Sequence, residues 1–327
     1  MTDLSVSYMG LRLKNPLIAG SSPLTATADH IEDLARNGIG AVVLKSIFEE
    51  QITGEAAMVG RYSDYYPEAH DYLHAYLGAN YMNSFTTLIS EAKRRTDIPI
   101  IASINCMSEG KWLEFAGRIT DAGADALELN IFFLPESKNE ASDKIEARYL
   151  SIIDKVARIV NLPVSVKFSV RFTNIFHMLQ QAYTRGARGA VMYNRFFEPD
   201  IDIERMEYIP AGELSTQAEL HKSLRYIAIA SSEIPGLDIS VSTGVHTGAD
   251  VVKSILTGAK ATQLCSTLML NGSKVIGEII SSLSAWMERN RFQTIEEFRG
   301  LMNRTTRPGD PLLERVQYMK TCPAEVF

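Results

Sequence analysis

Short runs of consecutive apolar residues recur along the chain, and segments with helical periodicity separate them. The runs fall at residues 16–19, 42–45, 98–105, 127–130, 162–168, 191–194, 238–241 and 262–265. Four of them follow a glycine that can end a helix, at Gly38, Gly123, Gly186 and Gly258. Continuous apolar runs bounded by turn residues are typical of parallel strands that are buried on both faces. The pattern therefore predicts eight strands that alternate with helices.

Strict alternation of this kind predicts an α/β fold, the (β/α)8 TIM barrel. A doubly wound open sheet is the alternative, but no GxGxxG motif follows an early strand. Two segments, 47–79 and 195–214, are too long for simple connections and carry many aromatic and acidic residues. Both follow strand C-terminal ends, so we expect extended loops on that face, as a lid, a substrate wall or a dimer contact. Residues 1–327 are expected to form one domain.

Two neighbouring strand-to-helix turns made of small residues lie within residues 237–268. Thr243-Gly244 forms the first turn, and Ser266-Thr267 opens the helix after the second. Such turns leave backbone N–H groups bare at helix starts, where they can bind a phosphate without a charged side chain. Two ordinary connecting loops are the alternative interpretation.

Polar residues terminate most of the predicted strands. They are Lys45, Asn105, Asn130, Lys167, Asn194 and Thr243. The C-terminal ends of barrel strands converge on one face, so these side chains would meet there. Lysine is rarely buried without a partner, and Lys167 lies in an apolar strand where little but a ligand could pair with it. The set predicts a pocket for a flat, polar, anionic ligand.

Composition narrows the class of protein. A net charge of −6 and a pI near 5.6 argue against a nucleic-acid surface, and no basic run is present. The N-terminus lacks the apolar core of a signal peptide, and no apolar run is long enough for a membrane span. Three cysteines without paired spacing favour a reducing compartment, so we expect a cytoplasmic protein. The six histidines show no metal-ligand spacing that has a partner pair, and no metal site is expected.

An ordered set of motifs resembles the dihydroorotate dehydrogenase family. The motifs are Asn15-Pro16, Leu44-Lys45-Ser46, Ala102-Ser103-Ile104-Asn105, Glu128-Leu129-Asn130, Val166-Lys167, Ser242-Thr243-Gly244, Thr247-Gly248-Ala249-Asp250, Ser266-Thr267 and residues 294–300. Together they cover nearly the whole barrel in family order. The resemblance implies an FMN-dependent enzyme of the class 1, cytosolic and homodimeric type, with a small-molecule substrate and no membrane-docking arm.

The same resemblance implies roles for individual residues. The cofactor-binding positions would be Ala19, Gly20, Lys45, Ser46, Asn105, Asn130, Lys167, Asn194, Thr243, Gly244, Ser266 and Thr267. Lys167 would stabilise negative charge on the reduced flavin ring. Lys45 would orient ring and substrate, and Asn130 would join these two lysines in the catalytic set.

The chain departs from the family where the catalytic base is expected. Phe133 stands where family members have cysteine or serine, and phenylalanine cannot accept a proton. We expect its ring to add bulk over the flavin face, and local packing against Phe132 is the alternative. Weaker candidates for the base, on position alone, are Cys106, Ser108 and Tyr193. The family's substrate loop is replaced by residues 65–83, and Arg195 follows Asn194 where threonine is usual.

Three functions fit these observations. The first is an FMN-dependent oxidoreductase acting on a CH–CH bond, with dihydroorotate or a related dihydropyrimidine as the nearest substrate. The second is a Schiff-base lyase that uses Lys167 as its nucleophile. The positive charge of the neighbouring Lys45 would favour the neutral amine form that this reaction needs. The third is a non-catalytic flavin binder. A yellow purified protein would favour the first or third, and trapping of an aldehyde by borohydride would favour the second.

Overall fold

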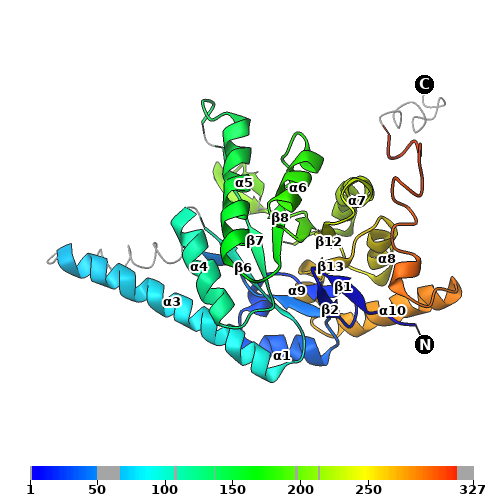
Figure 1. Cartoon of the computed structure of the whole chain (residues 1–327), viewed down its shortest axis with the longest axis horizontal. Coiled ribbons are helices and arrows are strands. Elements are labelled where there is room, and N and C mark those ends of the chain that lie inside the picture. The colour runs from blue at the N-terminus through cyan, green and yellow to red at the C-terminus, as the bar shows by residue number, and fades with distance from the viewer. Residues whose placement is uncertain are drawn as a thin grey trace.

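Eight parallel strands close into a barrel in the computed structural model of the protein (Figure 1). The structure describes residues 2–49, 67–106, 109–135, 137–195, 198–212 and 214–314, with the backbone alone for 67–80 and 109. The barrel strands are β3 (Leu17–Ala19), β4 (Ala41–Val43), β6 (Ile100–Asn105), β7 (Ala126–Asn130), β8 (Val164–Phe168), β9 (Gly189–Met192), β12 (Asp238–Ser242) and β13 (Ala261–Leu264). They follow one another in chain order, and pairing of β13 with β3 closes the ring. The predicted (β/α)8 TIM barrel is confirmed.

Helices surround the strands on the outside (Figure 1). They are α1 (Ala28–Arg36), α3 (Pro67–Arg95), α4 (Glu109–Asp121), α5 (Ser142–Ile159), α6 (Ile175–Thr184), α7 (His221–Glu233), α8 (Gly248–Leu256), α9 (Ser266–Asn271) and α10 (Val275–Arg289). Three short 3₁₀ turns are η1 (Pro23–Thr25), η2 (Gln217–Leu220) and η3 (Ile295–Glu297). From α3 to α8 each of these α-helices packs on the next, while α1 packs on α3 and α10 on α8.

Local sequence explains where these helices begin and end. At the start of α1 the Thr27 side chain accepts a hydrogen bond from the His30 N–H. At the start of α8, Thr247 and Asp250 form a reciprocal capping box. Gly258 follows α8 with a φ of +109°, a conformation that glycine adopts without a Cβ penalty. These signals deliver the chain into β13 at a defined residue.

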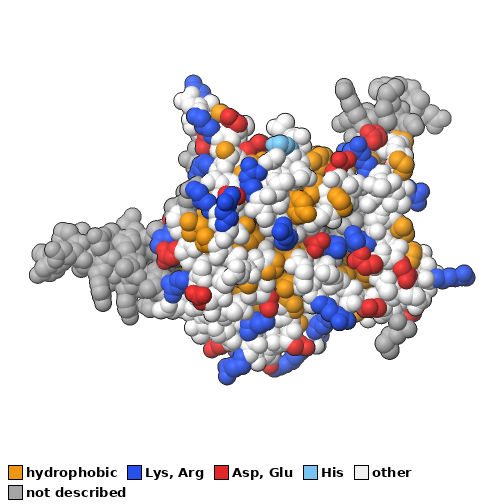
Figure 2. All heavy atoms as spheres, viewed as in Figure 1, with side chains coloured by type: hydrophobic (Ala, Val, Ile, Leu, Met, Phe, Trp, Pro, Cys, Tyr) orange, Lys and Arg blue, Asp and Glu red, His pale blue; other side chains and the backbone are white. Residues whose placement is uncertain are grey.

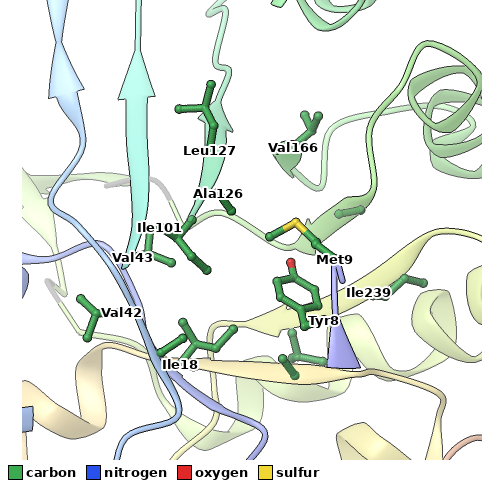
Figure 3. Packing of buried hydrophobic residues seen from close by; sticks show 14 of the residues in the cluster. Tyr8, Met9, Ile18, Val42, Val43, Ile101, Ala126, Leu127, Val166 and Ile239 are labelled. Carbon is green, nitrogen blue, oxygen red and sulfur yellow. The ribbon is translucent and has the colours of Figure 1, made fainter. Parts of the chain in front are cut away.

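An N-terminal hairpin, which the sequence pattern did not predict, covers the end of the barrel at which the strands begin. Strands β1 (Val6–Tyr8) and β2 (Leu11–Leu13) pair antiparallel, and the Met9 N–H donates to Asp238 Oδ2 at the start of β12 over 2.7 Å. The Tyr8 side chain is 1% exposed and lies inside the barrel among strand residues such as Ile18 and Ile239 (Figure 3). The hairpin therefore fills the barrel interior from its N-terminal end.

Further strands extend the C-terminal face. β5 (Ile47–Phe48) pairs with the end of β6. β10 (Glu198–Asp202) and β11 (Glu207–Ala211) form an exposed antiparallel hairpin within the 195–214 segment. The expectation of an extended loop is confirmed for that segment. Most of the 47–79 segment lies outside the described residues, so the expectation for it stays a prediction.

The surface shows no segregation of charge on the face drawn in Figure 2, where acidic and basic side chains are interspersed. None of the helices in the described ranges is long and apolar enough to cross a membrane. Within the same ranges, no group of three or more histidine, cysteine or acidic side chains could hold a metal ion.

Candidate cofactor and substrate site

A cavity of about 510 Å³ opens at the C-terminal ends of the barrel strands. Its volume is within the range of pockets that enclose small-molecule ligands. It is lined by Gly20, Ser21, Ser22, Pro23, Lys45, Ser46, Phe48, Asn130, Lys167, Asn194, Arg195, Leu214, Ser215, Ser242, Thr243, Gly244, Val245, Gln263, Cys265, Ser266 and Met269. The lining mixes hydroxyl, amide and cationic groups with a few apolar side chains, as expected for a polar, flat ligand.

Most of the predicted cofactor positions line this cavity. They are Gly20, Lys45, Ser46, Asn130, Lys167, Asn194, Thr243, Gly244 and Ser266. Ala19, Asn105 and Thr267 do not line it and are buried behind the wall. Phe48 of β5, the register partner of Asn105, lines the cavity instead. The Thr267 hydroxyl donates to the His246 carbonyl over 3.4 Å, so it supports the loop from behind.

A chain of hydrogen bonds joins the polar strand ends. The Asn194 side-chain amide donates to Asn130 Oδ1 over 2.7 Å, and the Asn130 amide donates to Ser46 Oγ over 3.5 Å. The Ser46 hydroxyl is in turn 2.8 Å from Ser103 Oγ and 3.1 Å from Ser21 Oγ. These contacts connect the C-terminal ends of β9, β7 and β4 and orient two of the predicted amides in the cavity wall.

The two small-residue turns do meet at the cavity, but they are less bare than the sequence suggested. The Gly244 N–H donates to Ser215 Oγ over 3.3 Å, and the Ser215 hydroxyl donates to Ser266 Oγ over 3.0 Å. One hydroxyl from the segment after β11 therefore links both turns, and the expectation of a bare N–H group is corrected for Gly244. Glycine is required at Gly244, where φ is +80° and a Cβ would lie 2.3 Å from the Leu220 nitrogen.

Lys167 has a protein partner, contrary to the sequence-based expectation that only a ligand could pair with it. Its Nζ lies 4.0 Å from Glu128 Oε1, and both residues are buried. Glu128 is two residues before Asn130 on β7, so alternation places both side chains on the barrel interior. This carboxylate gives the buried lysine a counter-charge within the protein.

None of the described candidates for the catalytic base faces the cavity. Phe133 packs against Tyr149 of α5 with ring centroids 5.2 Å apart, and the Arg148 guanidinium lies 3.9 Å from its ring. Its ring does not line the cavity, so the expectation of bulk over the flavin face is wrong. Cys106 is buried outside the lining, and Tyr193 lines a separate cavity of about 340 Å³ beside Tyr226. Ser108 lies outside the described residues.

Several lining residues were not predicted, and their signals differ. Cys265 follows β13 directly and could have been read as a strand-end residue. Burial raises the pKa of its thiol, although the Lys167 charge and the Ser22 hydroxyl oppose this, so the thiol is neutral near pH 7. The Arg195 guanidinium is held by Glu219 Oε2 at 3.3 Å and by the Gly212 carbonyl. No local sequence pattern indicated that pair or the position of Ser215.

Comparison with known proteins gives consistent results. The sequence model of a family described as "Dihydroorotate dehydrogenase" matches residues 3–287. A catalytic subunit of dihydroorotate dehydrogenase B (NAD(+)) from Thermoplasma acidophilum is 29% identical over 92% of this chain and 99% of its own length. The NAD-dependent dihydropyrimidine dehydrogenase subunit PreA of Escherichia coli is 24% identical over 95% of this chain and 79% of its own length. A putative dihydroorotate dehydrogenase A (fumarate) from Aeropyrum pernix is 26% identical over 92% of this chain and 98% of its own length.

The family match extends over most of the barrel, including the strand ends that line the cavity. The chain therefore belongs to the dihydroorotate dehydrogenase family, and it is an FMN-dependent oxidoreductase that acts on a CH–CH bond.

Proposed function

We propose that the protein oxidises or reduces the ring CH–CH bond of a dihydropyrimidine, with dihydroorotate or a close relative as its substrate. The observation that carries this proposal is the cavity in which Lys45, Lys167, Asn130 and Asn194 converge. Two cations and two amides offer hydrogen-bond donors and acceptors to a flat ring that carries carbonyl and N–H groups. The relatives named for dihydroorotate and dihydropyrimidine chemistry support the same substrate class.

The residues present fit FMN. The turns at Gly244 and Ser266, which both line the cavity, would hold its phosphate. Lys45, Asn130, Lys167 and Asn194 would surround its ring system. When bound, FMN would supply the group that accepts or donates hydride. The charged Lys167 would stabilise the electron-rich form of the ring.

The environment of Lys167 argues against the Schiff-base lyase. Lys167 is paired with the Glu128 carboxylate at 4.0 Å, whereas a lysine nucleophile must be available as a free amine. A non-catalytic flavin binder remains distinguishable by experiment, because it would bind FMN and fail to exchange electrons with any dihydropyrimidine.

Dihydroorotate oxidation is expected to be slow near neutral pH. Phe133 cannot act as a base, and Cys106 and Tyr193 do not line the cavity. Loss of a general base typically lowers a rate by about 10²–10⁴-fold. We propose that the chain lacks the cysteine or serine base at this position. We also propose that the 65–83 and 195–214 segments form a substrate wall that differs from that of family members which oxidise dihydroorotate.

The test is to release the bound ligand by heat, identify it by mass, and mix the yellow protein anaerobically with dihydroorotate, dihydrouracil or NADH. We expect FMN, and bleaching of its absorbance by a dihydropyrimidine. Asn130→Ala should slow bleaching because it removes the partner of Asn194. Tyr193→Phe, in the separate cavity, is the matched control and should leave the rate unchanged. Recovery of FAD, or no flavin after reconstitution, would contradict the proposal.

The remaining expectations concern the assembly and its surroundings. We propose a homodimer of class 1 type in the cytoplasm, with residues 1–327 as one domain. The resemblance to cytosolic family members supports this, and the Thermoplasma acidophilum and Escherichia coli relatives are themselves named as subunits. Light scattering after size-exclusion chromatography measures the mass directly, and a monomer at micromolar concentration would exclude the dimer.

A further inference from the structure

Beneath the cavity, a buried carboxylate faces the underside of Lys167. Glu128 on β7 is 1% exposed, and its Oε1 lies 4.0 Å from Lys167 Nζ on the neighbouring strand β8. Oε1 makes no hydrogen bond in the described part of the chain. The lysine reaches the cavity lining, but the carboxylate does not. Glu128 is therefore not in the lining, and the charged group through which it reaches the cavity is Lys167.

Gln263 fixes the other oxygen of this carboxylate. Its Nε2 donates to Glu128 Oε2 over 2.7 Å, and Gln263 is 2% exposed. A carboxylate accepts hydrogen bonds and cannot donate them, so the amide must present its nitrogen to Glu128. With Oε2 held in this way, Oε1 is left directed at the lysine. Glu128 is thus oriented by a residue on β13, across the barrel interior from β7.

The surroundings below Glu128 supply no competing cation. Tyr8 lies there, and burial together with the Glu128 and Asp238 charges raises the pKa of its phenol. The neighbouring strand positions carry Ser165 and Ser103. Among the described side chains, the ion pair of Glu128 is the one with Lys167. The positive charge of Lys167 is consequently partly compensated by one buried carboxylate, on the side away from the cavity.

We propose that Glu128 is a positioning residue that sets the strength of the positive charge which Lys167 presents to the flavin. The inference rests on the proposed binding of FMN in this cavity. Reduction adds negative charge to the ring, and a compensated lysine stabilises that charge less than an isolated one. Glu128 thereby keeps the midpoint potential of the bound flavin lower than Lys167 alone would set it, while Gln263 holds the carboxylate in place.

The test is a double-mutant cycle on the midpoint potential of FMN bound to the full chain. Glu128→Gln keeps the size of the side chain and an acceptor for Gln263, but it removes the charge. We expect the equilibrium constant for reduction to rise about tenfold, which corresponds to about 30 mV for a two-electron couple. In a Lys167→Met background the same substitution should change the potential far less. Asp238→Asn, a carboxylate at the opposite end of the barrel, is the charge-matched control and should leave the potential unchanged.

A second measurement does not depend on flavin. In the apoprotein, Glu128→Gln should lower the melting temperature when Lys167 is present, because it leaves a buried cation unpaired. It should raise the melting temperature in the Lys167→Met background, where Glu128 is the unpaired charge. An unchanged potential, or an equal shift in both backgrounds, would overturn the proposal. Failure to bind FMN would overturn the proposed function instead. If Glu128→Gln then changed the melting temperature of the apoprotein in the same direction in both backgrounds, the pairing of Glu128 with Lys167 would be overturned as well.

Discussion

At Gly244 the chain takes a left-handed turn while the backbone of η2 lies directly against it. The φ of +80° and the predicted 2.3 Å approach of a Cβ to the Leu220 nitrogen leave no room for a side chain. We expect Gly244→Ala to cost about 1–3 kcal/mol of stability and to weaken FMN binding, since the turn must shift. Chemical denaturation and a fluorescence titration with FMN measure the two effects.

A neighbouring glycine of the same cavity provides the control. At Gly20 a Cβ would come no closer than 3.5 Å to Gln263 and Leu264, which is ordinary contact. Gly20→Ala should therefore retain the stability of the parent protein. Equal losses in both variants would mean that the shape of the turn at Gly244 is not what limits binding.

Phe133 is expected to matter for stability and not for the ligand. Its ring makes an edge-to-face contact with Tyr149 and lies under the Arg148 guanidinium. Phe133→Ala should cost about 2 kcal/mol, the sum of one aromatic pair and one cation–π contact. Urea unfolding measures the loss, and Leu134→Ala, at an exposed position, is the control. A tenfold loss of FMN affinity without a loss of stability would place the ring in the cavity after all.

Among the elements, the β1–β2 hairpin has a measurable electrostatic signature. Burial raises the pKa of Tyr8 well above its ordinary value of 10.0. The unfolded chain releases this proton near pH 10 and the folded chain keeps it, so unfolding is favoured as the pH rises past about 10. The free energy of unfolding should then fall by up to about 1.4 kcal/mol per pH unit from this one group. Tyr8→Phe should make the decline shallower in urea unfolding between pH about 9 and 11.

Other buried tyrosines titrate in the same direction, so the comparison has to be made between variants. Burial raises the pKa of Tyr149 to about 12, and Tyr193 is also raised, but both remain in Tyr8→Phe. Tyr208→Phe, at a position 80% exposed, should leave the pH dependence unchanged. A Tyr8→Phe profile that matches the parent would show that Tyr8 is not enclosed by the barrel.

The elements that could be predicted are those whose burial is uniform. Strands such as β6, β7 and β8 are buried at every position because both faces are covered, and the resulting run of mostly apolar residues is visible in the sequence. The β1–β2 hairpin has only three residues in each strand, so its alternation of apolar and polar residues is too short to predict a strand. The β10–β11 hairpin is mostly exposed, including its apolar residues Ile201 and Tyr208, so it has no buried run of the kind that marks the barrel strands.

For the whole molecule, ligand binding and folding should be linked. A ligand that binds only the folded state stabilises it by about 2.7 kcal/mol at 100 times its dissociation constant. We expect FMN to raise the melting temperature of the apoprotein, and Gly244→Ala to reduce this increase at equal FMN concentration. No increase with FMN, under conditions in which the protein is folded, would contradict the assignment of the cavity.

The site as a whole was predictable in outline. Strand-end residues such as Lys45, Asn130 and Asn194 converge because the barrel topology brings all C-terminal strand ends to one face. Glu128 could have been inferred from its spacing of two residues before Asn130, which places it on the same side of β7. Ser215 and Arg195 could not, because long-range loop packing places them, and a single sequence does not record which loops meet.

The hydrogen bonds that run from Asn194 through Asn130 to Ser46 have a mechanical meaning. They join β9 to β7 and β7 to β4, pairs of strands that are not neighbours in the ring. Backbone hydrogen bonds connect each strand with the next one in the barrel, whereas these side-chain hydrogen bonds connect strands that are separated by another strand. These hydrogen bonds fix the distances between the C-terminal ends of the three strands before a ligand binds. A rigid planar ring can bind without first ordering the side chains of the cavity wall, so less of its binding energy is lost to conformational entropy.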